Sequence, residues 1–121
     1  MTFTSHGVIG AGVRAAAGKA FGLSEEWCVW LAILGAVEGM APDALDWLAW
    51  FLFGVPRWQL YSLMHGRLAW IGLIFWGYGA HILWDKPFHK VAGEDWWPRL
   101  WWLEVFGLAF GLALLGWTFA P

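Results

Sequence analysis

The stretch LWWLEVFGLAFGLALLGWTFA, residues 100–120, decides the fold class of this chain. It is the longest apolar stretch in the sequence, and Glu104 is its one charged residue. A helix that crosses a bilayer needs about 20 consecutive apolar residues. Residues 100–120 therefore predict a membrane-spanning helix.

The composition of the whole chain agrees with a membrane protein. Of the 121 residues, 60% are hydrophobic and 13% are charged. A typical soluble domain is about 45–50% apolar and about 25% charged, so both departures favour a bilayer. The formal net charge of -2 leaves no basic stripe for neutralising phosphates, which argues against nucleic acid as a partner. The length predicts one domain, residues 1–121, and the single Cys28 is expected to fill space as a small apolar side chain.

Four other apolar stretches predict further helices, namely residues 7–22, 27–41, 43–55 and 68–84. The stretch 27–41 is barely long enough to span a bilayer, and 43–55 is too short to cross. We expect 43–55 to lie along the interface or to re-enter the membrane. The sequence thus predicts an all-α polytopic membrane protein with about four transmembrane or re-entrant helices and one short interfacial helix.

Two prolines mark expected helix boundaries. Pro42 separates stretches 27–41 and 43–55, and it suits the first turn of a new helix. Lys86-Pro87 follows the stretch 68–84. The residue before a proline is pushed out of helical geometry, so we expect the helix to end there.

Tryptophan and glycine patterns also fit membrane helices. Tryptophans gather near the expected helix ends, where an indole can bury its ring and keep its N–H wet; they are Trp27, Trp30, Trp47, Trp50, Trp84, Trp96, Trp97, Trp101 and Trp102. Glycines recur at four-residue spacing, as in Gly18/Gly22, Gly35/Gly39 and Gly107/Gly111. That spacing permits close helix contact, but sixteen glycines produce some such pairs by chance.

Arg14 and Glu38 are charged residues in the interior of predicted helices. Arg14 is in the middle of stretch 7–22, and Glu38 is near the end of stretch 27–41. We expect Arg14 to face protein or water, or to extend its charge to a headgroup. An ionised Glu38 without a partner would be costly, so it is either protonated or close to a metal ion, Arg14 or another cation.

His81, Asp85 and His89 follow one another at four-residue spacing. Side chains four apart on a helix project from one face, so His81 and Asp85 can hold one divalent ion through mixed nitrogen and oxygen ligands. Asp85 lies at an expected helix C-terminus, where the macrodipole disfavours an anion, so a cation is expected nearby. The alternative is that His81 is a hydrogen-bonded interior histidine and that Asp85 pairs with Lys86 or Lys90.

A second carboxylate pair, Asp43 and Asp46, follows Pro42. Capping and the helix dipole alone would favour Asp43 in a first turn, so it is equally a structural residue or a ligand. Asp46 shares its face and adds a second oxygen ligand or a general base. The remaining histidines, His6 and His65, also flank apolar segments rather than ordinary loops.

These elements occur in a recognisable order: His6, then Ala41-Pro42-Asp43 with Asp46, then His65-Gly66, then Gly79-Ala80-His81-Ile82-Leu83-Trp84-Asp85 with His89. In this order they resemble the small bacterial membrane-bound metal-dependent hydrolase family, over nearly the whole chain. That family shows an early His, Pro-Asp-x-Asp, a His-rich element and His-Leu-x-x-Asp-x-x-Thr-His. The resemblance implies a multi-pass protein of the prokaryotic cytoplasmic (inner) membrane that holds a divalent metal, zinc being the expected ion. Its expected reaction is hydrolysis of an ester or phosphodiester bond, with membrane lipid as the candidate substrate.

The resemblance also implies roles for the matching residues. The metal ligands would be His6, Asp43, His65, His81 and Asp85. His89 or Asp46 would move the proton in catalysis. Arg67 or Lys90 would bind a phosphate oxygen of the substrate.

The sequence departs from the family pattern in two ways that affect this set. The second aspartate is displaced by one position, which turns Asp46 by about a further 100° around a helix. His65 and His81 are sixteen residues apart, about 24 Å along a straight helix. Either the glycines at 72, 77 and 79 break that helix, or His65 lies outside the site.

Two other classes of function stay open. One is a non-catalytic metal-binding or structural subunit, with a second copy or another membrane protein as partner. The other is a proton or ion pathway lined by Glu38, Asp43, His81 and Asp85. Bound metal without hydrolysis would indicate the subunit, and pH-dependent ion flux in liposomes would indicate the pathway.

Overall fold

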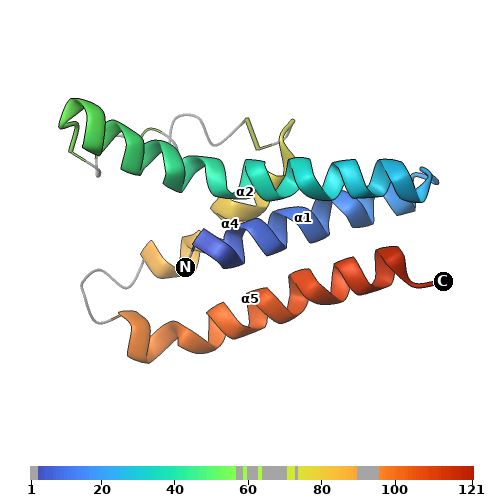
Figure 1. The fold of residues 1–121 in the computed structure, drawn as a ribbon. Helices are drawn as coiled ribbons and strands as arrows, with labels where there is room; N and C mark the ends of the chain where they lie inside the picture. Colours follow the sequence, from blue (N-terminus) through green and yellow to red (C-terminus); the bar gives the residue numbers. More distant parts are fainter. Residues whose placement is uncertain (1–2, 57–58, 60–62, 64–70, 73, 90–95) are drawn as a thin grey trace.

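The computed structural model describes residues 3–56, 59, 63, 71–72, 74–89 and 96–121. Over this part the chain is all-α, with four helices and no strand, which confirms the predicted class. The helices are α1 (Phe3–Ala20), α2 (Glu25–Phe53), α4 (Trp76–His89) and α5 (Trp96–Phe119). In Figure 1, α1 lies between α2 and α5, and α4 packs against α1 and α2.

A short turn joins α1 and α2 into an antiparallel hairpin (Figure 1). Gly22 adopts a positive φ of 74°, which a residue without a Cβ reaches at little cost. The Ser24 hydroxyl then accepts a hydrogen bond from the Trp27 N–H at 3.5 Å and so caps α2. Glu25 and Glu26 occupy the first turn of α2, where negative charge complements the helix dipole.

Helix α2 continues through Pro42 to Phe53, so the prediction of two stretches divided at this proline is wrong. Pro42 has no N–H, and the only intrahelical bond it removes is the one to the carbonyl of Glu38. The surrounding helices enclose Pro42 almost completely, and packing compensates for that loss. The helix ends instead at Gly54, whose positive φ of 64° lets its N–H bond back to the Trp50 carbonyl.

Glycines let the backbones of α1 and α2 come together. A Cβ on Gly10 would collide with the Gly35 carbonyl oxygen, and a Cβ on Gly35 would collide with that of Gly10. One turn along α2, a Cβ on Gly39 would collide with the carbonyl oxygen of His6. The Gly35/Gly39 spacing therefore serves a helix contact inside this chain.

Helix α4 begins at Trp76, so the prediction of one helix over 68–84 is wrong. Before it, residues 71–72 form a short 3-10 turn and Ile74 lies in a turn. Gly72 and Gly79 meet across this bend, where a Cβ on Gly72 would lie 2.7 Å from the Gly79 Cα. This agrees with the expectation that glycines interrupt the segment. The expected stop at Lys86-Pro87 is also wrong, because α4 continues to His89.

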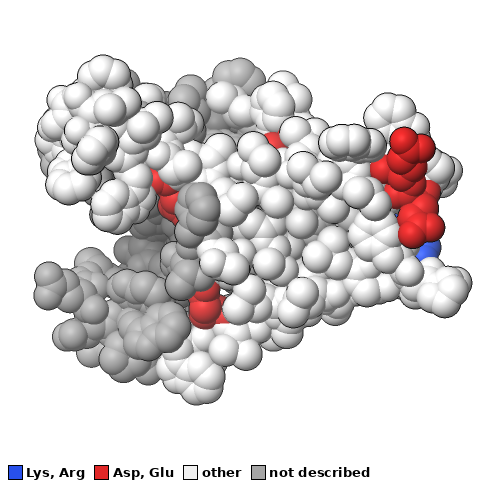
Figure 2. Space-filling view, in the orientation of Figure 1, with Lys and Arg blue, Asp and Glu red and all other residues white. Residues whose placement is uncertain are grey.

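Large apolar side chains cover much of the outer surface. Phe51, Leu83 and Phe106, for example, are 77%, 71% and 58% exposed. In Figure 2 most of the described surface is free of charged side chains; the largest acidic group lies at the end where α2 begins, and only small charged patches show elsewhere. Among the described residues, Glu25–Phe53 and Trp101–Phe119 are helices long and apolar enough to cross a membrane.

Candidate metal centre

Three helices bring three polar side chains to one place in the interior. They are His6 from α1, Asp43 from α2 and His81 from α4, and each offers a ligand atom within 4.8 Å of the other two. The two histidines are each 1% exposed, whereas the Asp43 side chain is 25% exposed. The cluster is therefore buried on the histidine side and open on the aspartate side.

The ring of His81 is held by the backbone of α2. His81 Nδ1 lies 2.8 Å from the carbonyl oxygen of Gly39, which can only accept, so Nδ1 carries the proton. A neutral imidazole protonated at Nδ1 keeps a lone pair on Nε2. Histidines that bind metals commonly donate their other nitrogen to a carbonyl in this way.

The Gly39 carbonyl is accessible because of the local sequence of α2. Gly39 has no side chain to cover its carbonyl oxygen. The same glycine lets His6 approach, since its Cα faces the His6 carbonyl. One residue of α2 thus contacts both α1 and α4 at the cluster.

His6 is bound by Asp43. His6 Nδ1 lies 2.8 Å from Asp43 Oδ2, and the His6 and His81 ring centroids are 3.8 Å apart with the planes tilted by 49°. This contact brings a His6 nitrogen and an Asp43 oxygen side by side, and both can be ligands of one ion only if the ion replaces the hydrogen bond between them.

This donor set fits a divalent ion. Two imidazole nitrogens and one carboxylate oxygen are ligands that zinc accepts. Bonds of about 2.0–2.2 Å place neighbouring ligands in a tetrahedral site roughly 3.4 Å apart. The candidate atoms lie within 4.8 Å of one another, so the side chains must draw closer to bind one ion together.

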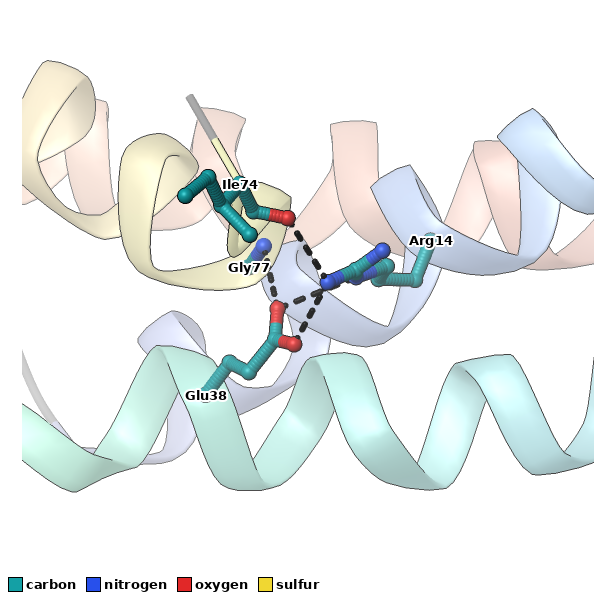
Figure 3. A network of polar contacts seen from close by, with 4 residues as sticks. All are labelled: Arg14, Glu38, Ile74 and Gly77. Carbon is teal, nitrogen blue, oxygen red and sulfur yellow. Dashed lines mark hydrogen bonds and ion pairs between the residues drawn. The ribbon is translucent and has the colours of Figure 1, made fainter. Parts of the chain in front are cut away.

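An ion pair joins α1 and α2 near the start of α4 (Figure 3). Arg14 binds Glu38 with two hydrogen bonds, Nε to Oε2 at 3.0 Å and Nη2 to Oε1 at 2.6 Å. The side chains of Arg14 and Glu38 are 16% and 7% exposed. Of the alternatives for Glu38, the one that places it next to Arg14 is confirmed, and Arg14 faces protein.

The same pair fixes the start of α4. Glu38 Oε2 accepts a hydrogen bond from the Gly77 N–H at 2.9 Å, where the helix dipole favours a negative group. Arg14 Nη2 donates to the Ile74 carbonyl at 3.2 Å, and its guanidinium lies 5.9 Å from the Trp76 ring centroid. Because Gly77 is one turn before His81, these contacts also position the histidine.

The structure places the other predicted site residues as follows. Asp46 is 3% exposed and lies one turn beyond Asp43 on α2, but it is outside the cluster of three. Asp85 and His89 lie on the last turns of α4, and their side chains are outside the described part of the structure. His65, Arg67 and Lys90 are outside the described residues.

One buried polar contact next to the site was not predicted. Ser5, the neighbour of His6, donates its hydroxyl to Glu104 Oε1 of α5. Both side chains are buried, at 0% and 4% exposure. The signal in the sequence was a single carboxylate inside a long apolar stretch, which needs a partner when buried.

No protein-family model, curated protein or solved structure matches this chain. Membership of the metal-dependent hydrolase family therefore stays a prediction, and the case for a metal centre depends on the geometry of His6, Asp43 and His81.

Proposed function

We propose that this chain is a multi-pass protein of the prokaryotic cytoplasmic membrane that binds a divalent ion, zinc, and hydrolyses an ester or phosphodiester bond of a membrane lipid. The observation that carries the proposal is the convergence of His6, Asp43 and His81 from three helices. Ionisable groups in an apolar interior are costly unless they share a ligand or partner. A cation bound by all three would offset that cost.

The outer surface supports the membrane part of the proposal. Helix α2 and residues Trp101–Phe119 are long enough to span, and their outward side chains are large and apolar. Trp27 and Trp30 near one end of α2, and Trp47 and Trp50 near the other, are about half exposed or more. Exposed indoles near helix ends are typical of membrane interfaces.

The arrangement also suits hydrolysis. A bound divalent ion supplies Lewis acidity at a carbonyl or phosphoryl oxygen and makes a water more acidic. Asp43 is the partly exposed member of the cluster, so water and substrate reach the site from its side. Asp46, one turn further on the same helix, would accept the proton, while His81 is kept in one tautomer by Gly39.

Elemental analysis of the detergent-purified protein tests the metal. We expect stoichiometric zinc in the wild type and its loss in His81→Ala. Thr118→Ala is the control, because Thr118 is buried in α5 and its hydroxyl donates to the Leu114 carbonyl of the same helix. Wild-type protein that folds without bound metal, or His81→Ala with full metal content, would contradict the proposal.

A lipid assay tests the reaction. Wild-type protein in liposomes of phosphatidylethanolamine and phosphatidylglycerol should release products detectable by mass spectrometry, and His81→Ala should not. Bound metal with no product would instead support the non-catalytic subunit. The hydrogen bonds from His6 to Asp43 and from His81 to Gly39 favour that second candidate, since they stabilise the fold without turnover.

A further inference from the structure

An apolar cavity runs beside the candidate metal centre. Its volume is about 520 Å³, and it lies between α1, α4 and α5. Two glycines and six larger apolar residues line it: Ile9, Val13, Trp76, Ala80, Leu83 and Phe110. No charged side chain is among them, so the cavity suits a hydrocarbon ligand.

The contacts of α1 and α4 give the cavity a direction. The rings of His6 and His81 meet at one level, and Arg14 lies over Trp76 at another, so the two helices run antiparallel. Ile9 and Val13 follow His6 by one and two turns, which places Val13 about 10 Å along the helix axis from His6. The cavity therefore runs from the level of the polar cluster, where Ala80 and Leu83 flank His81, to Val13 and Trp76 at its far end.

We propose that this cavity holds one acyl chain of a membrane lipid, with the polar part of that lipid at His6, Asp43 and His81. A polar cluster at one end and an apolar channel at the other match the two parts of such a molecule. The outer surface is apolar, so in the proposed membrane location the molecules next to the cavity are lipids. This inference rests on the proposed function and specifies its substrate as an acyl lipid.

Photocrosslinking tests the occupant. The probe is phosphatidylcholine with a diazirine near the end of one acyl chain, in liposomes with the wild-type protein. We expect cross-links enriched at Val13, Trp76 and Phe110 over the exposed Leu112 of α5. In Val13→Trp, where the new ring fills the far end, these cross-links should fall by about tenfold, equivalent to about 1.4 kcal/mol of affinity.

The control is Ala113→Trp, which adds the same ring at an exposed position of α5 and should leave the cross-links unchanged. Thermal unfolding checks that each variant folds. The cross-linking readout does not require bound metal. If Val13→Trp does not fold, Phe110→Ala decides, because removal of this lining ring enlarges the cavity and should admit a longer probe chain. An unchanged chain-length preference would then overturn the proposal.

Three further outcomes separate the possible explanations. Cross-links that are no richer in the cavity than at Leu112, or that survive in folded Val13→Trp, overturn the acyl site. A drop in oligomer mass in Val13→Trp with unchanged lipid cross-links means that a second copy fills the cavity, and this also overturns it. Cross-links that persist in His81→Ala after metal is lost support the acyl site independently, so its failure and that of the metal proposal are distinguishable.

Discussion

His81 illustrates how one histidine can be held by the protein and still offer a ligand atom. Its Nδ1 is occupied by the Gly39 carbonyl at 2.8 Å, and its ring lies against His6 in the interior. This contact orients the ring without using Nε2. The hydrogen bond and the proposed metal bond can therefore be removed separately by substitution.

Two isosteric substitutions at His81 should separate these roles. The amide nitrogen of His81→Asn falls near the position of Nδ1 and can keep the bond to Gly39, whereas that of His81→Gln reaches toward Nε2. We expect both variants to lose zinc. His81→Gln should lose about 1–3 kcal/mol more stability than His81→Asn, because in His81→Gln the Gly39 carbonyl also loses its donor. Metal content and thermal unfolding measure the two effects, and full metal content in His81→Asn would contradict a ligand role.

At the residue scale, the sequence predicted all three members of the cluster but not the contacts that hold them. His6, Asp43 and His81 were in the predicted ligand set, and the structure brings them within reach of one ion, although metal binding itself stays a prediction. The role of Gly39 could not be predicted, because a helix carbonyl meets a side-chain donor of another helix only where the two helices pack together. Nor could the sequence choose among the partners open to Glu38, since that depends on the face α1 turns toward α2.

At the scale of elements, the sequence predicted that helices form but misplaced several of their ends. Pro42 and Pro87 both lie inside helices, where each removes a single intrahelical bond that packing can offset. Local rules for proline treat a helix in isolation, so they predicted ends at both positions. The late start of α4 at Trp76 depends on the contact between Gly72 and Gly79, a tertiary feature absent from local patterns.

The same glycine substitution should have opposite effects in two helices. In Gly35→Ala the new methyl would collide with the Gly10 carbonyl and lie 2.7 Å from Arg14 Cγ, so α1 and α2 must separate. We expect a loss of about 1–3 kcal/mol in the free energy of unfolding. In Gly116→Ala nothing lies within 4 Å, and higher helix propensity should add roughly 0.5–1 kcal/mol. Thermal unfolding in one detergent compares them, and equal shifts would mean that this crossing is not close-packed.

At the scale of the whole molecule, apolar surface faces outward and the polar groups of α1, α2 and α4 face one another. Glu38, Asp46 and His81 are at most 7% exposed, while Phe53 and Leu112 are 77% and 58% exposed. This distribution is the reverse of that in a soluble protein. It is the expected one for a chain whose surroundings are hydrocarbon.

Cysteine labelling can test whether hydrocarbon surrounds the chain, because Cys28 is the only cysteine in the sequence and is buried. In a Cys28→Ala background, Leu23→Cys and Leu112→Cys place thiols at sites of similar exposure, 45% and 58%. In unsealed membranes a water-soluble maleimide should label position 23, at the α1–α2 turn. Position 112 should stay unlabelled, because a thiol in hydrocarbon does not form the reactive thiolate. Equal labelling of both would show that α5 is exposed to water.

The contacts between α1 and α5 have a consequence for how the chain assembles. Ser5 binds Glu104 near one end of α1, and at the other end Lys19 donates to the Trp117 carbonyl at 2.7 Å. Synthesis proceeds from α1 toward α5, so Ser5 and Lys19 make these two contacts only after the later helix has emerged. The first helix of this chain is thus completed by its last, and a nascent chain that stops before Glu104 lacks both contacts.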